Sequence, residues 1–186
     1  MLRILPFLLA APLLIAGCTA TTPSRFAVEA GTLDTKQRTS AKSISITKVT
    51  LPAYAKETGI FVRDASGALV PVPRADWADE PERAMTLALV RNLSASTDAQ
   101  VAGDPWPLGG TPEAEVRIDV DEMIVDSSNT MTLSGQFSIR RDEATTRNRI
   151  KRFNIRTRAA SQKAGDIVNA HGSAWRRLAG EIGKAL

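Results

Sequence analysis

The sequence predicts an α+β fold: a two-layer sandwich in which an antiparallel sheet carries a helix in mid-chain and a long C-terminal helix on one face. Three observations predict it. Apolar and polar residues alternate along three segments between residues 115 and 158, as in strands with one buried and one wet face. Residues 81–93 have a well-marked helix start, and residues 164–185 carry an apolar stripe at helical spacing.

The N-terminus has the features of a lipoprotein signal. Arg3 is followed by an apolar stretch, residues 4–15, which matches a secretory hydrophobic region and is too short to span a bilayer as a helix. Two small residues then precede Cys18, the only cysteine, whose thiol is the nucleophile that diacylglycerol attachment requires. This stretch resembles the bacterial lipobox. We therefore expect residues 1–17 to be a cleaved signal peptide and Cys18 to be lipidated; the alternative is an ordinary secretory peptide with an incidental cysteine.

Lipidation at Cys18 predicts a location as well as an anchor. Two or three buried acyl chains hold a protein stably on a membrane, whereas one chain binds only reversibly. Thr19, rather than Asp, follows Cys18, which favours the periplasmic face of the outer membrane over retention in the inner membrane. An exported protein with 24 Lys and Arg against 20 Asp and Glu gives no reason to expect a nucleic-acid partner.

The mature chain divides into a tether and one domain. Residues 18–42 are rich in Thr, Ser and Ala without a sustained period, so they are predicted to be a lipidated tether, with a short strand around residues 25–28. Residues 43–186 are predicted to form a single α+β domain.

The predicted domain begins with strands. Residues 43–51 alternate in polarity with one slip, which indicates a half-buried strand with a bulge. Residues 60–62 and 69–72 flank a turn and predict a hairpin. Because Pro71 and Pro73 lack an N–H for a ladder, the returning strand is predicted to be an edge strand.

A helix is predicted to start at Pro81, where acidic neighbours favour the positive end of the helix dipole. Its apolar stripe consists of Met85, Ala88, Leu89 and Leu93. Trp77 is predicted to pack over it. A short strand at residues 99–102 and a Gly- and Pro-rich loop at residues 103–112 follow; Trp106 in this loop either covers a core edge or contacts a partner.

The clearest sheet signal comes next. The predicted inward residues of its three strands are Val116, Ile118, Val120 and Ile124, then Met131, Leu133, Phe137 and Ile139, then Phe153 and Ile155. Together they predict an antiparallel meander with one wet face. The C-terminal apolar stripe consists of Ala164, Ile167, Val168, His171, Ala174, Trp175, Leu178, Ile182 and Ala185. A helix of this length is long enough to cross the sheet.

Catalytic patterns are absent from the sequence. His171 is the only histidine and lies on the apolar helix face, which favours a satisfied, partly buried structural role over a catalytic base. There is no nucleophile elbow, no phosphate-binding glycine loop, and no second His or Cys for a metal site. We therefore expect a protein that is not an enzyme and needs no cofactor.

Charge is concentrated in the meander. Arg152, Arg156 and Arg158, in the third strand, are candidates to contact a partner or lipid phosphates, with a merely solubilising face as the alternative. Glu115, Asp119 and Asp121 line the first strand and are candidate subunit contacts. If the basic strand of one copy faces the acidic strand of the next, the chain forms a homo-oligomeric ring.

Several motifs together resemble a known family. They are the lipobox, Leu51-Pro52-Ala53-Tyr54, Ile60-Phe61-Val62-Arg63, Trp77-Ala78-Asp79-Glu80-Pro81 and the helix end Asn92-Leu93-Ser94. The chain resembles the ABC-type transport auxiliary lipoproteins, and within them the PqiC-like members, of the paraquat-inducible protein C type.

The resemblance implies a function in lipid transport. It implies an outer-membrane lipoprotein that docks the periplasmic tube of an MCE-domain protein, itself connected to an inner-membrane permease, and that supports envelope integrity. The alternative is a structural or assembly lipoprotein of the outer membrane, acting with lipopolysaccharide export or with a cell-wall enzyme.

Overall fold

The computed structural model describes residues 22–29, 36–141 and 148–186. Within these residues one sheet and two α-helices account for most of the structure. The strands are β1 (Ser24–Phe26), β2 (Ser43–Ile46), β3 (Gly59–Arg63), β4 (Leu69–Trp77), β5 (Gln100–Gly103), β6 (Ala114–Asp126), β7 (Thr130–Arg141) and β8 (Arg149–Arg158). The helices are α1 (Pro81–Ser96) and α2 (Ala164–Ala185), and a short 3-10 helix, η1, spans Ala53–Lys56.

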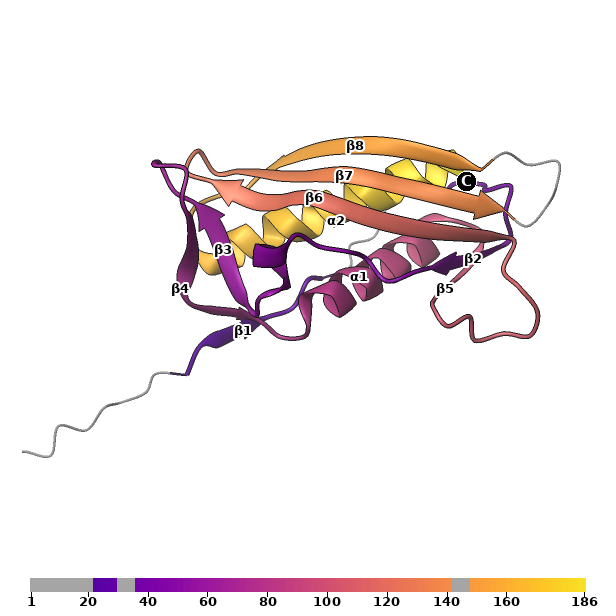
Figure 1. Cartoon of the computed structure of the whole chain (residues 1–186), viewed down its shortest axis with the longest axis horizontal. Helices are drawn as coiled ribbons and strands as arrows, with labels where there is room; N and C mark the ends of the chain where they lie inside the picture. The colour runs from indigo at the N-terminus through magenta and orange to yellow at the C-terminus, as the bar shows by residue number, and fades with distance from the viewer. Residues whose placement is uncertain (1–21, 30–35, 142–147) are drawn as a thin grey trace, which may run out of the picture.

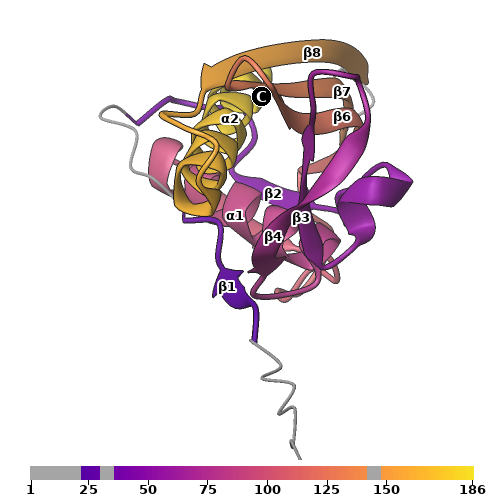
Figure 2. The same ribbon diagram turned by 90° about the vertical axis from the view of Figure 1, so that its left-hand side faces the viewer.

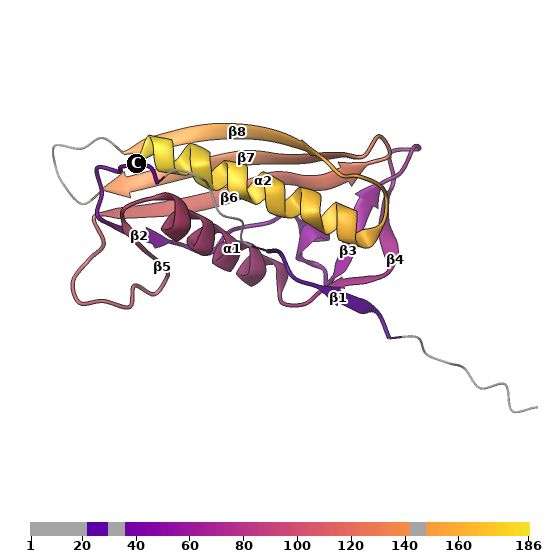
Figure 3. The ribbon, with the colours of Figure 1, turned by 180° about the vertical axis from the view of Figure 1, so that it is seen from behind.

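The predicted α+β architecture is confirmed. Both long helices lie on the same side of the sheet, α1 beside α2, and α2 runs along β7 and β8 (Figure 3). The end-on view shows β8 passing over α2, with β7 and β6 beside that helix and α1 below it (Figure 2). The apolar stripe predicted for α2 is buried, and Trp175 and Leu178 are fully covered.

The sheet is mixed, which refines the prediction of an antiparallel one. The meander β6–β7–β8 is antiparallel throughout, as predicted. The other edge of β6, however, is shared by two short parallel partners: β2 pairs with its first half and β3 with its end. β5 adds to β2 in parallel, and β1 to β4. A strand of 13 residues is longer than either partner, so two of them are needed to satisfy its backbone.

The turn between β6 and β7 follows from its sequence. The Asp126 carboxylate accepts hydrogen bonds from the backbone N–H groups of Ser128 and Thr130, at 2.8 and 2.9 Å. Asn129 has a φ of 64°, a conformation that asparagine tolerates better than most residues.

Gly135 in β7 allows β6 and β7 to approach closely where β6 bulges. The register of this pair shifts between Val120 and Glu122, directly opposite Gly135. A Cβ atom at residue 135 would lie 2.2 Å from the carbonyl oxygen of Asp119. Only glycine fits this position without moving a strand.

Two expectations about the ends of the sheet need correction. β4 was predicted to be an edge strand, but β1 pairs with its second half, at Ala75 to Trp77, beyond the two prolines. The predicted tether also contributes to the fold: Val28, Thr39 and Ala41 are buried, and Gln37 forms a bridge with Thr97. Apolar residues in a Thr- and Ser-rich segment are too few to give a periodic signal, so the sequence did not reveal this packing.

Candidate functional site

The first candidate region is the segment between β2 and β3, which contains η1. The first two turns of α1 hold it by its backbone. The N–H of Val49 donates to Oγ1 of Thr86 at 3.0 Å, and the N–H of Leu51 donates to Oε1 of Glu82 at 3.2 Å. These bonds attach the segment to the helix, so its course depends on two α1 side chains.

Glu82 is a buried carboxylate with three partners. Besides the Leu51 N–H, it contacts the ammonium groups of Lys48 at 2.7 Å and Lys56 at 3.2 Å. Burial disfavours its charged form, but hydrogen bonds from Lys48, Leu51 and Lys56 outweigh burial and hold the pKa of Glu82 below its usual value. The charged carboxylate of Glu82 therefore holds the segment between β2 and β3 against the start of α1.

Tyr54 fills the place where β6 changes partners. Its hydroxyl accepts a hydrogen bond of 2.9 Å from the backbone N–H of Met123, just after the β6 bulge. Burial raises the pKa of Tyr54, so the phenol stays neutral. The tyrosine of the Leu-Pro-Ala-Tyr motif thus satisfies a backbone donor that a regular ladder would have paired.

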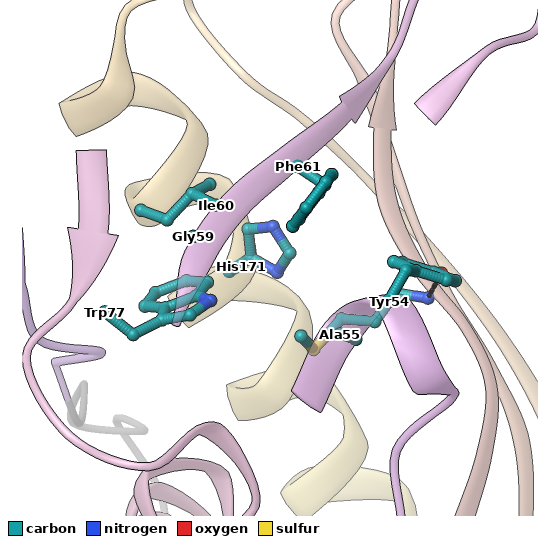
Figure 4. A pocket seen from close by; sticks show the side chains of 8 residues that line it. Tyr54, Ala55, Gly59, Ile60, Phe61, Trp77 and His171 are labelled. Atoms are coloured by element: carbon teal, nitrogen blue, oxygen red, sulfur yellow. Dashed lines mark hydrogen bonds between the residues drawn. The ribbon is translucent and has the colours of Figure 1, made fainter. Parts of the chain in front are cut away.

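A small aromatic pocket lies behind Tyr54 (Figure 4). Residues from η1, β3, the end of β4, β6 and α2 line it; they are Tyr54, Ala55, Gly59, Ile60, Phe61, Trp77, Met123 and His171. Its cavity of about 10 Å³ is close to the minimum that holds one water molecule. It is too small for a substrate.

His171 is more deeply buried than predicted. Its exposed fraction is 2%, and the ring of Trp77 packs edge-to-face on it with centroids 5.3 Å apart. Within the described residues neither imidazole nitrogen has a hydrogen-bond partner, so the expectation of a satisfied histidine is wrong. Burial lowers the pKa of His171 to about 4, which keeps the ring neutral near pH 7. The pocket lining includes no carboxylate that would orient the ring as a base.

The second candidate region is the outer face of β6, β7 and β8, turned away from the helices. Here the predicted acidic and basic residues meet within one chain. Arg152 lies 2.8 Å from Asp121, Arg140 lies 2.5 Å from Glu115, and Arg117 lies 3.3 Å from Asp119. Exposed pairs of this kind contribute at most about 1 kcal/mol each.

These pairs change the geometry of the predicted ring contact. Arg152 was expected to face acidic residues of the next subunit, but it reaches across β7 to Asp121 of its own chain. Arg156 and Arg158 are exposed on the same face. A head-to-tail contact between subunits remains a prediction. It would use Arg156 and Arg158, or the ion pairs within each chain would have to be replaced by ion pairs between neighbouring chains.

Trp106 lies in the connection between β5 and β6 and is half-buried. This connection is at the opposite end of the molecule from β1 (Figure 1). A surface groove of about 360 Å³ lies between the start of α1 and the end of β5, lined by Lys48, Glu80, Arg83, Thr86, Leu87, Gly103 and Asp104. Both cations of this lining are already paired, Lys48 with Glu80 and Arg83 with Asp79, so they give the groove little preference for an anion.

In the described residues no three His, Cys, Asp or Glu side chains are grouped to hold a metal ion. No described helix is long and apolar enough to cross a membrane. Cys18, the predicted lipidation site, lies outside the described residues.

Comparison with known proteins identifies the class of protein that this fold represents. The sequence model of the ABC-type transport auxiliary lipoprotein component matches residues 27–183, which is nearly the whole described fold. The chain therefore belongs to this family, as its motifs predicted, and the family is one of auxiliary lipoproteins rather than of known enzymes. No curated protein sequence matches significantly.

Solved structures share the fold at low sequence identity. A crystal structure described only as that of an uncharacterised protein superposes with a TM-score of 0.71 at 14% identity, covering 89% of this chain and 99% of the other. A protein of Xanthomonas campestris gives a TM-score of 0.62 at 16% identity, covering 87% and 90%. The PelC dodecamer of Paraburkholderia phytofirmans gives 0.44 at 8%, covering 85% and 92%.

Sequence reasoning missed the roles of Glu82 and Tyr54. The signal for Glu82 was its position beside Pro81, in the first turn of a helix, where a carboxylate also favours the dipole. Nothing in the sequence indicated that both lysines and a distant backbone N–H would converge on it, because those contacts join residues about 30 positions apart.

Proposed function

We propose that this chain is the docking lipoprotein of an MCE-type intermembrane lipid transport system. It is anchored by Cys18 on the periplasmic face of the outer membrane and receives the tube of an MCE-domain protein that is connected to an inner-membrane permease. The family match over residues 27–183 carries this proposal, because it spans the folded domain rather than one motif. In this role the chain supports envelope integrity and performs no chemistry itself.

The position of the N-terminal strand supports an orientation. Five residues lie between Cys18 and Ser24, so an extended chain spans at most about 20 Å between the lipidated residue and β1. The β1 end of the domain would then lie close to the membrane. The opposite end carries the β5–β6 connection with Trp106, together with the C-terminus (Figure 1). We propose that this far end meets the tube.

A closed tube also has consequences for assembly. A small domain can cap a ring of subunits only by repeating around the same axis, so the proposed function includes a homo-oligomeric ring. Arg152, Arg156 and Arg158 are the predicted cationic side of its subunit contact, and Glu115, Asp119 and Asp121 are the acidic side, with the internal ion pairs exchanged between neighbours.

Site-specific crosslinking in cells tests the proposal. A photoreactive residue in place of Trp106 should crosslink to the MCE-domain protein, whereas the same residue in place of exposed Arg25, in β1, should not. Both variants must still be lipidated and must restore envelope integrity in a deletion strain. Crosslinks from position 106 to a lipopolysaccharide-export or cell-wall protein, and none to an MCE protein, would favour the assembly role instead.

A further inference from the structure

One margin of the sheet is a long, regular edge strand. Among the residues that the structure describes, β8 pairs with β7 alone, over all ten of its residues. β1 and β5, which end the other path of the sheet, have only three and four residues. β8 also contains no proline, no glycine and no register shift. Proteins usually shorten or interrupt such an edge, because it is a template for another strand.

The direction of the free backbone groups follows from hydrogen bonds at the two margins of the meander, one at β8 and two at β6. The carbonyl of Arg156 accepts a hydrogen bond from the guanidinium of Arg177, in α2, at 3.2 Å, so it points away from β7. Along a strand these directions alternate. The N–H and C=O groups of Arg152, Asn154 and Arg156 therefore face the open edge.

The same alternation holds across the sheet. The carbonyls of Val116 and Ile118 in β6 accept from the N–H groups of Thr47 and Thr50, on the side away from β7. Their neighbours Arg117 and Asp119 pair with Ser138 and Gln136 of β7. The β7 residues that alternate with Ser138 and Gln136 direct their backbone N–H and C=O groups toward β8. The register thus leaves the even-numbered residues of β8 without a strand partner.

The charge of β8 indicates what such a partner would be. Its ten residues include five cations and no acid, and Arg152, Arg156 and Arg158 are exposed on the outer face. Within the described part of the chain, only Arg152 of these three forms an ion pair with a carboxylate, that of Asp121. Ile150, 72% exposed, adds an apolar contact near the start of the strand.

Self-pairing of two β8 edges is unfavourable for the same reason. Two copies would bring five cations against five, and like charges on adjoining strands are destabilising. An anionic lipid surface would match the charge but would leave the backbone groups unused. A polypeptide with acidic side chains satisfies both features.

We propose that the open edge of β8 binds an extended acidic segment of a partner protein by strand addition. The partner strand pairs with the backbone of Arg152 and Asn154 and with the N–H of Arg156, whose carbonyl already accepts from Arg177. Its carboxylates, two residues apart, lie against the arginines of the outer face. This interaction does not require the docking function proposed above, but it uses Arg156 and Arg158, the same side chains as the proposed ring contact, so one β8 edge serves either the acidic segment or a neighbouring subunit.

The test uses the full lipidated chain in non-ionic detergent with a defined probe. The probe is a fluorescent ten-residue peptide that alternates glutamate with valine, and binding is followed by anisotropy at low salt. Arg156→Glu/Arg158→Glu should weaken binding at least tenfold. The control is Arg117→Glu, an exposed arginine on the same sheet face but two strands from the edge; it should change binding less than twofold.

Two further measurements separate strand addition from simple charge attraction. A peptide with the same charges but N-methylated at alternate residues cannot donate to the edge, and it should bind at least tenfold more weakly. On saturation, hydrogen exchange of the Arg152, Asn154 and Arg156 amides should slow at least tenfold, while the Phe153 and Ile155 amides, already paired with β7, should not change.

Each result that contradicts strand addition indicates a different role for the β8 arginines. Equal affinity for the N-methylated peptide, or unchanged exchange at the three edge amides, would overturn the proposal and leave a general anion-binding face. Displacement of the peptide by phosphatidylglycerol vesicles, without protection of those amides by the peptide, would assign the arginines to lipid. No peptide binding at all, with a folded monomer, would show that the cations only keep the edge soluble.

Discussion

The hydroxyl oxygen of Tyr54 lies 2.9 Å from the backbone nitrogen of Met123 and accepts a hydrogen bond from its N–H group. This contact joins η1 to the point on β6 where pairing passes from β2 to β3. Between the stretches of β6 that pair with β2 and with β3, backbone N–H groups have no partner among the described strands. The Tyr54 side chain accepts a hydrogen bond from one of them. We therefore expect the arrangement of β2 and β3 to depend on Tyr54.

Tyr54→Phe removes this acceptor and leaves the Met123 N–H buried without a partner. The free energy of unfolding should fall by about 1 to 2 kcal/mol. Urea unfolding followed by circular dichroism measures the loss, and hydrogen exchange should quicken at Met123 but not at Leu133 in the centre of β7. Unchanged exchange at Met123 would mean that water or another group replaces the hydroxyl.

Gly135→Ala should destabilise the meander. The added methyl would meet the Asp119 carbonyl oxygen at 2.2 Å, and this obstacle is backbone rather than a flexible side chain. A loss of about 2 to 3 kcal/mol is expected from the forced shift of β6. Gly165→Ala, in the first turn of α2 with no atom near its Cβ position, is the control and should be neutral or slightly stabilising.

Trp175→Ala should cost about 3 to 5 kcal/mol, because this side chain is fully buried between α2 and the sheet. Lys184→Ala, exposed in the last turn of the same helix, should change stability by less than about 0.5 kcal/mol. Thermal or urea unfolding of both variants checks the prediction. Equal melting temperatures would show that α2 does not depend on this contact.

His171 should make the domain less stable in acid. Its pKa is 6.5 in the unfolded chain and about 4 in the fold, so the unfolded state binds the extra proton between these values. Neutral His171 makes its full contribution to the free energy of unfolding above pH 6.5. As the pH falls to 4 this contribution is lost, and the free energy of unfolding decreases by about 3 kcal/mol. In His171→Leu, unfolding free energies measured between pH 7.5 and 4 should lose this slope. A slope equal to that of the wild type would assign the acid sensitivity to carboxylates such as Glu82.

Cys18→Ala should abolish anchoring without affecting the fold, because Cys18 is the only cysteine that can accept a lipid. The variant should remain unprocessed or appear in the soluble fraction, and it should fail to complement a deletion strain. Its purified domain should unfold at the same urea concentration as the wild type. Fractionation with outer membranes together with full complementation would contradict the lipoprotein assignment.

The sequence by itself determined the elements whose signals are local. The period-2 alternation of β6, β7 and β8 predicted the meander and its buried face up to Val120. Beyond that residue the prediction of an inward Ile124 was wrong, because the bulge places Met123 and Val125 opposite the inward residues of β7. The stripe from Ile167 to Ile182 predicted α2 with Trp175 at its centre. Pro81 marked the start of α1. These succeed because one period and one cap suffice to specify a strand or a helix that buries a single face.

Only the tertiary structure decided which strands share β6, where the carboxylates find their cations, and what surrounds His171. Short strands such as β2 and β3 have no local feature that selects a parallel partner some 60 to 70 residues away. Likewise, Arg152 and Asp121 belong to two oppositely charged segments of the sequence. They form an ion pair only because the fold places β6 and β8 in one meander, on either side of β7. Pairing depends on distances across the sheet, and a linear pattern does not contain those distances.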